Sequence, residues 1–97
     1  MDSTGIDLSG QIILIVEDQP MLALNLQVAL EEAGAETIVA RGPRDALARV
    51  RQFAFSAAII DPGQRALARE LEQLGLLIVR KPASRSELLA RLALLVH

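Results

Sequence analysis

The stretch IILIVEDQP, residues 12–20, decides the fold. It opens with five aliphatic residues, 12–16, most of them β-branched, and stops at Glu17 and Asp18. An apolar run without polar alternation is typical of a strand buried on both faces, as in a parallel sheet. Pro20 suits the first position of a helix. The stretch therefore predicts a buried strand, an acidic strand end and the start of a helix.

The same order of strand and helix repeats along the rest of the chain. The predicted strands are residues 12–16, 37–40, 57–60 and 76–79, and the predicted helices are residues 20–33, 43–52, 65–74 and 85–96. Gly34 and Gly75 stop two of the helices, and Ser84 with Glu87 forms a capping box before the last. This alternation predicts an α/β fold, a doubly wound parallel sheet of four strands in the order 2-1-3-4. We expect the first and last helices on one face and the other two on the opposite face.

Composition narrows the function classes. The chain has 97 residues, a net charge of -2, 52% hydrophobic residues and no cysteine, which predicts one domain with an aliphatic core and no disulfide. We expect no direct DNA binding, no membrane span and a cytoplasmic location, because the chain lacks a basic surface, a long apolar run and a secretory signal. We interpret the arginines between residues 41 and 69 as solvated sides of the second and third helices.

Charged residues follow three of the predicted strands. Glu17 and Asp18 follow the first, Asp61 the third and Lys81 the fourth. In an open parallel sheet, ligands bind beyond the carboxyl ends of the strands, where the strand order reverses. Carboxylates this close repel one another, and Mg²⁺ together with a lysine relieves that repulsion. The same charges suit transfer of a phosphoryl group to a carboxylate.

Each of these residues also has an ordinary structural interpretation. Glu17 and Asp18 suit the start of a helix, where acidic side chains are favoured. Asp61 before Pro62 suits a turn, and Lys81 suits a solvated strand end. The convergence of three strand ends on one crevice favours the functional interpretation.

Three motifs, taken in order, resemble those of response-regulator receiver domains, the phosphoacceptor modules of bacterial two-component signalling. They are IILIVEDQP (12–20), AAIIDPG (57–63) and VRKPAS with SELLARL (79–92). The segment EDQPMLALNLQVALEEAGAE (17–36) is similar to stand-alone receivers of alphaproteobacteria. The resemblance implies a flavodoxin-like, receiver-like domain over residues 11–97, after a flexible tail of residues 1–10.

The resemblance also implies residue roles. Asp61 accepts a phosphoryl group from the phosphohistidine of a sensor histidine kinase or a phosphotransfer protein. Asp18, Asp61 and the backbone carbonyl of Gly63 hold Mg²⁺, and Glu17 acts through water. Lys81 contacts the phosphoryl group. The chain is then a phosphoacceptor in a phosphorelay and not an enzyme, with output by protein–protein contacts.

The chain also departs from the family pattern. One strand and one helix fewer lie between Asp61 and the Lys-Pro pair, and no Ser or Thr switch hydroxyl is evident. Ile78 stands where the family usually has an aromatic residue. Pro62 lacks the backbone N–H that the family directs at the phosphoryl oxygens. The resemblance further implies a cis peptide bond before Pro82.

The last helix carries more apolar residues than one sheet contact requires. We therefore predict a homodimer, with Leu88, Leu92 and Leu95 as its surface; the alternative is that the terminal residues fray. Two other function classes compete with the phosphoacceptor. One is a degenerate, non-phosphorylated receiver that acts as a dimerisation or interaction module. The other, ranked last, is a Mg²⁺-dependent phosphatase-like enzyme, for which no general acid, general base or cap is apparent.

Overall fold

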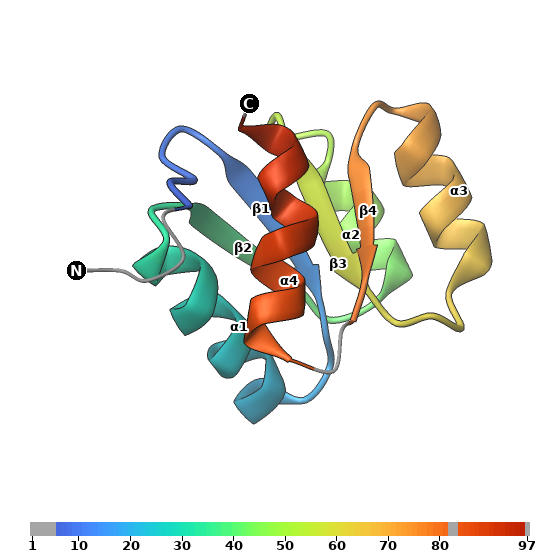
Figure 1. The fold of residues 1–97 in the computed structure, drawn as a ribbon. Coiled ribbons are helices and arrows are strands. Elements are labelled where there is room, and N and C mark those ends of the chain that lie inside the picture. The colour runs from blue at the N-terminus through green and yellow to red at the C-terminus, as the bar shows by residue number, and fades with distance from the viewer. Residues whose placement is uncertain (1–5, 82–83, 97) are drawn as a thin grey trace.

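The computed structural model describes residues 6–81 and 84–96, in which strands and helices alternate (Figure 1). The elements are β1 (Ile12–Val16), α1 (Pro20–Glu32), β2 (Glu36–Ala40), α2 (Pro43–Arg49), β3 (Ala57–Ile60), α3 (Arg65–Gln73), β4 (Leu77–Arg80), α4 (Arg85–Leu92) and the short 3-10 helix η1 (Ala93–Leu95). All three strand pairs are parallel, and the order is β2-β1-β3-β4. The predicted fold class and strand order are confirmed.

Two hydrophobic cores, aliphatic except for Phe55 in one of them, lie on opposite faces of the sheet. On β1, Ile13 and Ile15 pack in one core with α1 and α4, and Leu14 and Val16 pack in the other with α2 and α3. The side chains of a strand alternate between faces, so a run without polar residues buries both of them. In Figure 1, α1 and α4 lie in front of the sheet and α2 lies behind it, as the sequence predicts.

Hydrogen bonds and glycines at the helix ends determine where the helices stop and start. Gly34 and Gly75 follow α1 and α3 with φ of 103° and 95°, a region that favours glycine. The Leu76 N–H donates to the Leu71 carbonyl at 3.1 Å, so Leu76 closes the helix end and pairing begins one residue later than predicted. The Glu87 N–H donates to Ser84 Oγ at 3.1 Å, which confirms the predicted N-cap of α4.

Leu8 belongs to the core, although it lies in the segment predicted to be a flexible tail. Its side chain is fully buried in the core shared by α1 and α4. Its N–H donates to the Ala33 carbonyl at 2.7 Å, and its carbonyl accepts from the Gln11 N–H at 3.0 Å. The packed part of the chain therefore starts before Gln11, because this segment covers the carboxyl end of α1.

The predicted dimer surface on the last helix is corrected by the packing. Leu88 and Leu92 are buried against the sheet, and Leu95 is partly buried against the same core. They face their own sheet because the helix follows β4 closely and covers β1 and β3. Among the described residues of this end of the chain, Leu94 is the large apolar side chain that is exposed. Within the described residues, no helix is long and apolar enough to cross a membrane.

Replacing Leu8 by Ala tests the role of the first described residues. We expect Leu8→Ala to lower the free energy of unfolding by about 2–4 kcal/mol, because a fully buried leucine is lost and a cavity remains. Leu94→Ala removes the same atoms from an exposed position and should cost less than about 0.5 kcal/mol. Urea unfolding followed by far-ultraviolet circular dichroism measures both. Equal costs would contradict the packing of Leu8.

Candidate functional site

The carboxyl ends of the strands meet at one edge of the sheet. The Glu17 N–H, just after β1, donates to the Ala40 carbonyl of β2 at 2.9 Å. The Lys81 N–H, just after β4, donates to the Ile60 carbonyl of β3 at 2.8 Å. These bonds continue the sheet pairing past the strand ends and bring the following side chains together. The strand order reverses between β1 and β3, where ligands of such sheets bind.

Glu17 is a buried carboxylate held by two donors. Its Oε2 accepts from the Gln19 N–H at 3.0 Å, and its Oε1 is hydrogen-bonded to Lys81 Nζ. The hydrogen bond from Lys81 lowers the pKa of Glu17 and outweighs burial, which acts in the opposite direction. Glu17 is therefore an ionised carboxylate at neutral pH, although its side chain is only 4% exposed.

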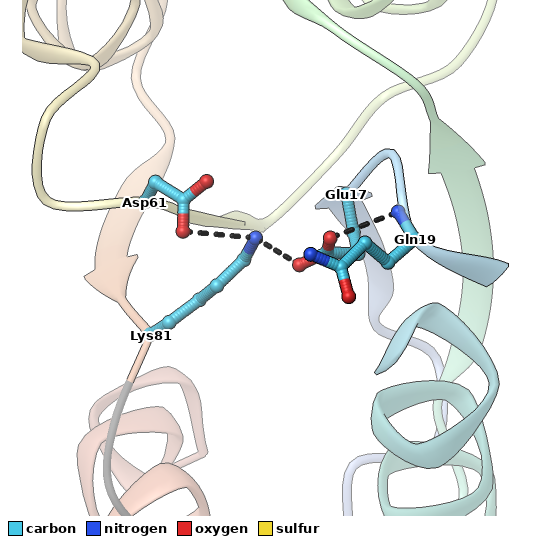
Figure 2. Close-up of polar contacts among 4 residues, drawn as sticks. All are labelled: Glu17, Gln19, Asp61 and Lys81. Carbon is cyan, nitrogen blue, oxygen red and sulfur yellow. Dashed lines mark hydrogen bonds and ion pairs between the residues drawn. The ribbon is translucent and has the colours of Figure 1, made fainter. Parts of the chain in front are cut away.

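Lys81 connects the ends of two strands that are not its own. Figure 2 shows its ammonium group between the carboxylates of Glu17 and Asp61, and Nζ lies 3.1 Å from Asp61 Oδ1. The Asp61 side chain is 55% exposed, so this carboxylate is open to an incoming group while Glu17 is not. One lysine therefore balances a buried structural carboxylate and an accessible one.

A cavity of about 210 Å³ lies over the ends of β1, β2 and β3. Glu17, Asp18 and Asp61 line it together with Arg41 and Gln64. Asp18, which the resemblance implies as a metal ligand together with Asp61, is exposed in this cavity. The cavity thus has two accessible carboxylates, and one of them, Asp61, is paired with Lys81.

Gly63, predicted to supply a carbonyl to a metal, lines a different hollow between α2 and α3. The chain turns directly after Asp61, where the Gln64 N–H donates to the Asp61 carbonyl at 3.1 Å. This turn carries Gly63 toward α2 and α3 and leaves Gln64 at the cavity. Pro82, for which a cis peptide bond was predicted, lies outside the described residues.

The donor set partly fits the divalent cation that the resemblance implies. Within residues 6–81 and 84–96, no three Asp, Glu, His or Cys side chains are grouped closely enough to hold a metal. Asp18 and Asp61 supply the hard oxygen ligands that Mg²⁺ prefers, and Mg²⁺ commonly keeps several waters. Gln64 Oε1, from the same lining, is buried and has no hydrogen-bond partner among residues 6–81 and 84–96. The residues therefore suit a hydrated cation held by two carboxylates, because Glu17 is engaged by Lys81.

Sequence reasoning found the carboxylates and the lysine but missed Arg41 and Gln64. Arg41 was interpreted as part of a solvated helix side, whereas it precedes α2 and lines the acidic cavity. Its signal was present, since Arg41 directly follows β2 at the same sheet edge as Glu17. Gln64 had no such signal, because the turn after Asp61 places it.

Removing the lysine tests the charge arrangement. We expect Lys81→Met to lower the free energy of unfolding by about 3 kcal/mol, because it leaves the Glu17 carboxylate buried without a cation. Asp61→Asn should cost less than about 1 kcal/mol, since Asp61 is more than half exposed. Denaturant unfolding at pH 7 in a chelating buffer compares them. A smaller cost for Lys81→Met than for Asp61→Asn would contradict the structure.

The lowered pKa of Glu17 predicts a pH dependence. Its stabilising contribution is complete above its unfolded pKa of about 4.3 and is lost as the pH falls through the lower folded value. In Lys81→Met, burial without the lysine raises the pKa of Glu17 above its ordinary value, whereas the pKa in the parent is lowered. We therefore expect the stability gap between the parent and Lys81→Met to narrow as the pH falls from the raised pKa of the variant toward the lowered pKa of the parent, because protonation of Glu17 removes the unpaired charge. Leu8→Ala is the control, because its cost involves no ionisable group. A gap that stays constant from pH 7 to pH 3.5 would rule out this pairing.

No protein-family model and no curated protein matches the sequence. The structure shows a small α/β domain of flavodoxin-like topology, with four parallel strands in the order 2-1-3-4.

Proposed function

We propose that this chain is a single-domain response regulator that accepts a phosphoryl group on Asp61. The observation that carries the proposal is the position of Lys81 Nζ between a buried carboxylate after β1 and an exposed carboxylate after β3. A carboxylate nucleophile needs access to its donor and a nearby positive charge to stabilise the transferred group. Asp61 has both.

In the proposed reaction, an Asp61 carboxylate oxygen attacks the phosphorus of a phosphohistidine. The new O–P bond forms as the P–N bond breaks, and the imidazole nitrogen of the donor keeps the electron pair. Lys81 lies within reach of the phosphoryl oxygens, because its Nζ is already 3.1 Å from Asp61. Glu17 acts as a positioning residue, since its buried carboxylate holds the lysine at this place.

Mg²⁺ is the proposed cofactor, and when bound it supplies positive charge to the phosphoryl oxygens. Asp18 and Asp61 would hold it, with waters as its further ligands. The Gly63 carbonyl that the resemblance implies is not one of the proposed ligands, because Gly63 lines the hollow between α2 and α3. Glu17 is not proposed to act on the cation, because it is engaged by Lys81. The donors are a sensor histidine kinase or a phosphotransfer protein in the cytoplasm, and the output is by protein contacts.

The alternative is a degenerate receiver that serves as an interaction module. Pro62 supports it, because the residue after the acceptor has no N–H to offer a phosphoryl group. Exposed apolar side chains on α1 also support it, with Met21, Leu24 and Val28 at helical spacing. This function predicts a homodimer through α1 that forms with or without a phosphodonor.

Intact-mass analysis after incubation with a small acyl phosphate tests the phosphoacceptor. We expect one phosphoryl adduct on the parent chain in the presence of Mg²⁺, because Asp61 is exposed and has a cation beside it. Asp61→Asn should give none, and Asp18→Asn should reduce labelling at least tenfold through loss of a metal ligand. Asp7→Asn changes an exposed carboxylate outside the site and should label as the parent does.

An unlabelled parent, under conditions that label an ordinary receiver, would overturn the proposal. Light scattering then decides for the alternative, which requires a stable dimer. A dimer broken by Leu24→Asp in that case would assign the function to α1.

A further inference from the structure

Arg41 is the basic residue in the lining of the acidic cavity. It shares the lining with Asp18 and Asp61, and it directly follows β2. Arg41 forms no ion pair among residues 6–81 and 84–96, which it shares with several other arginines, but it alone of the arginines lines this cavity. A guanidinium left free beside two carboxylates has donors available for a further ligand.

The backbone at Arg41 is held from both sides. The Ala40 carbonyl accepts from the Glu17 N–H at 2.9 Å, which joins this loop to the end of β1. The Arg41 N–H donates to Asp45 Oδ2 at 3.2 Å, and Asp45 is paired with Arg49 at 3.4 Å. These bonds hold the backbone of Arg41 at the edge of the cavity, and its side chain is exposed there.

The charges at the strand ends leave one negative charge without a cation once Asp61 carries a phosphoryl group. Glu17, Asp18 and Asp61 carry three negative charges against one on Lys81, and a divalent cation would neutralise the remaining two. A phosphoryl group on Asp61 then adds one more negative charge, because an acyl phosphate dianion replaces the carboxylate. Arg41 is the cation in the cavity lining that can neutralise it.

We infer that Arg41 binds the phosphoryl group on Asp61, supplying hydrogen-bond donors where Pro62, the residue directly after Asp61, has no N–H. The inference rests on the proposed function. A guanidinium presents paired N–H groups that match two phosphoryl oxygens, which a lysine at the same place does not. Arg41 thereby holds the transferred group from the β2 side while Lys81 holds it from the β4 side.

The test compares labelling rates of Asp61 over a range of acyl phosphate concentrations in Mg²⁺. In this reaction the Asp61 oxygen bonds to phosphorus, and the carboxylate of the donor leaves with the electron pair of the broken P–O bond. The variants are Arg41→Gln and Arg41→Lys, and the matched control is Arg44→Gln, an exposed arginine that lies outside the cavity. Circular dichroism checks that thermal stability is unchanged, as expected for a side chain without an ion pair.

We expect Arg41→Gln to lower the labelling rate at low acyl phosphate concentration by about tenfold. This loss is smaller than the loss expected on removing a fully buried hydrogen-bond donor, because Arg41 is exposed. Arg41→Lys should recover part of that loss, and Arg44→Gln should stay within about twofold of the parent. A purely structural role would not give partial recovery with lysine at unchanged stability. Labelling of Arg41→Gln at the parent rate would overturn the inference.

If the parent is not labelled at all, the proposed function fails, and a second measurement still decides the role of Arg41. Titration of ¹⁵N-labelled protein with inorganic phosphate in Mg²⁺ reports on the Nε–H signal of Arg41. A saturable shift that is absent in Lys81→Met supports a phosphate contact shared by the two cations. No shift of this signal would overturn the inference.

Discussion

Strands β1 and β3 carry apolar side chains on both faces. These side chains are buried from solvent only if helices cover the sheet on both sides. Parallel strands need crossover connections, and the right-handed crossover then sets the face on which each helix lies. Parallel strands also end at the same edge. Burial of the aliphatic core and the gathering of charged side chains at one edge are therefore two results of a single constraint.

The direct pairing of β4 with β3 shapes the chemistry of that edge. Ile60 pairs with Arg80, so the next residue, Lys81, stands beside Asp61. The lysine side chain then spans β3 to reach Glu17 at the end of β1. Because Glu17 is buried and Asp61 is exposed, the lysine is held on one side and available on the other. The buried ion pair between Glu17 and Lys81 thereby positions the Lys81 ammonium beside Asp61. Specifying an arrangement is a better-supported role for buried ion pairs than raising the free energy of unfolding.

The last helix shows why apolar surplus in a sequence is a poor guide to an interface. Leu88 and Leu92 were predicted to meet a second chain, but they fill the core that α4 shares with α1. The exposed apolar residues Met21, Leu24 and Val28 lie instead on α1, which is apolar on more than one side. Helical spacing gives the relative positions of side chains but not the direction in which the helix faces, and neighbouring elements decide that direction.

The sequence by itself determined the fold class, the strand order and the three strand ends at the site, because apolar runs, helix stops and crossover handedness are local or general rules. It also marked Glu17, Asp61 and Lys81, since each directly follows a strand. Only the tertiary structure decided that Glu17 is buried and Asp61 exposed, that Leu8 covers the end of α1, and that Arg41 lines the cavity. These features depend on packing between segments far apart in the chain, which no local pattern encodes.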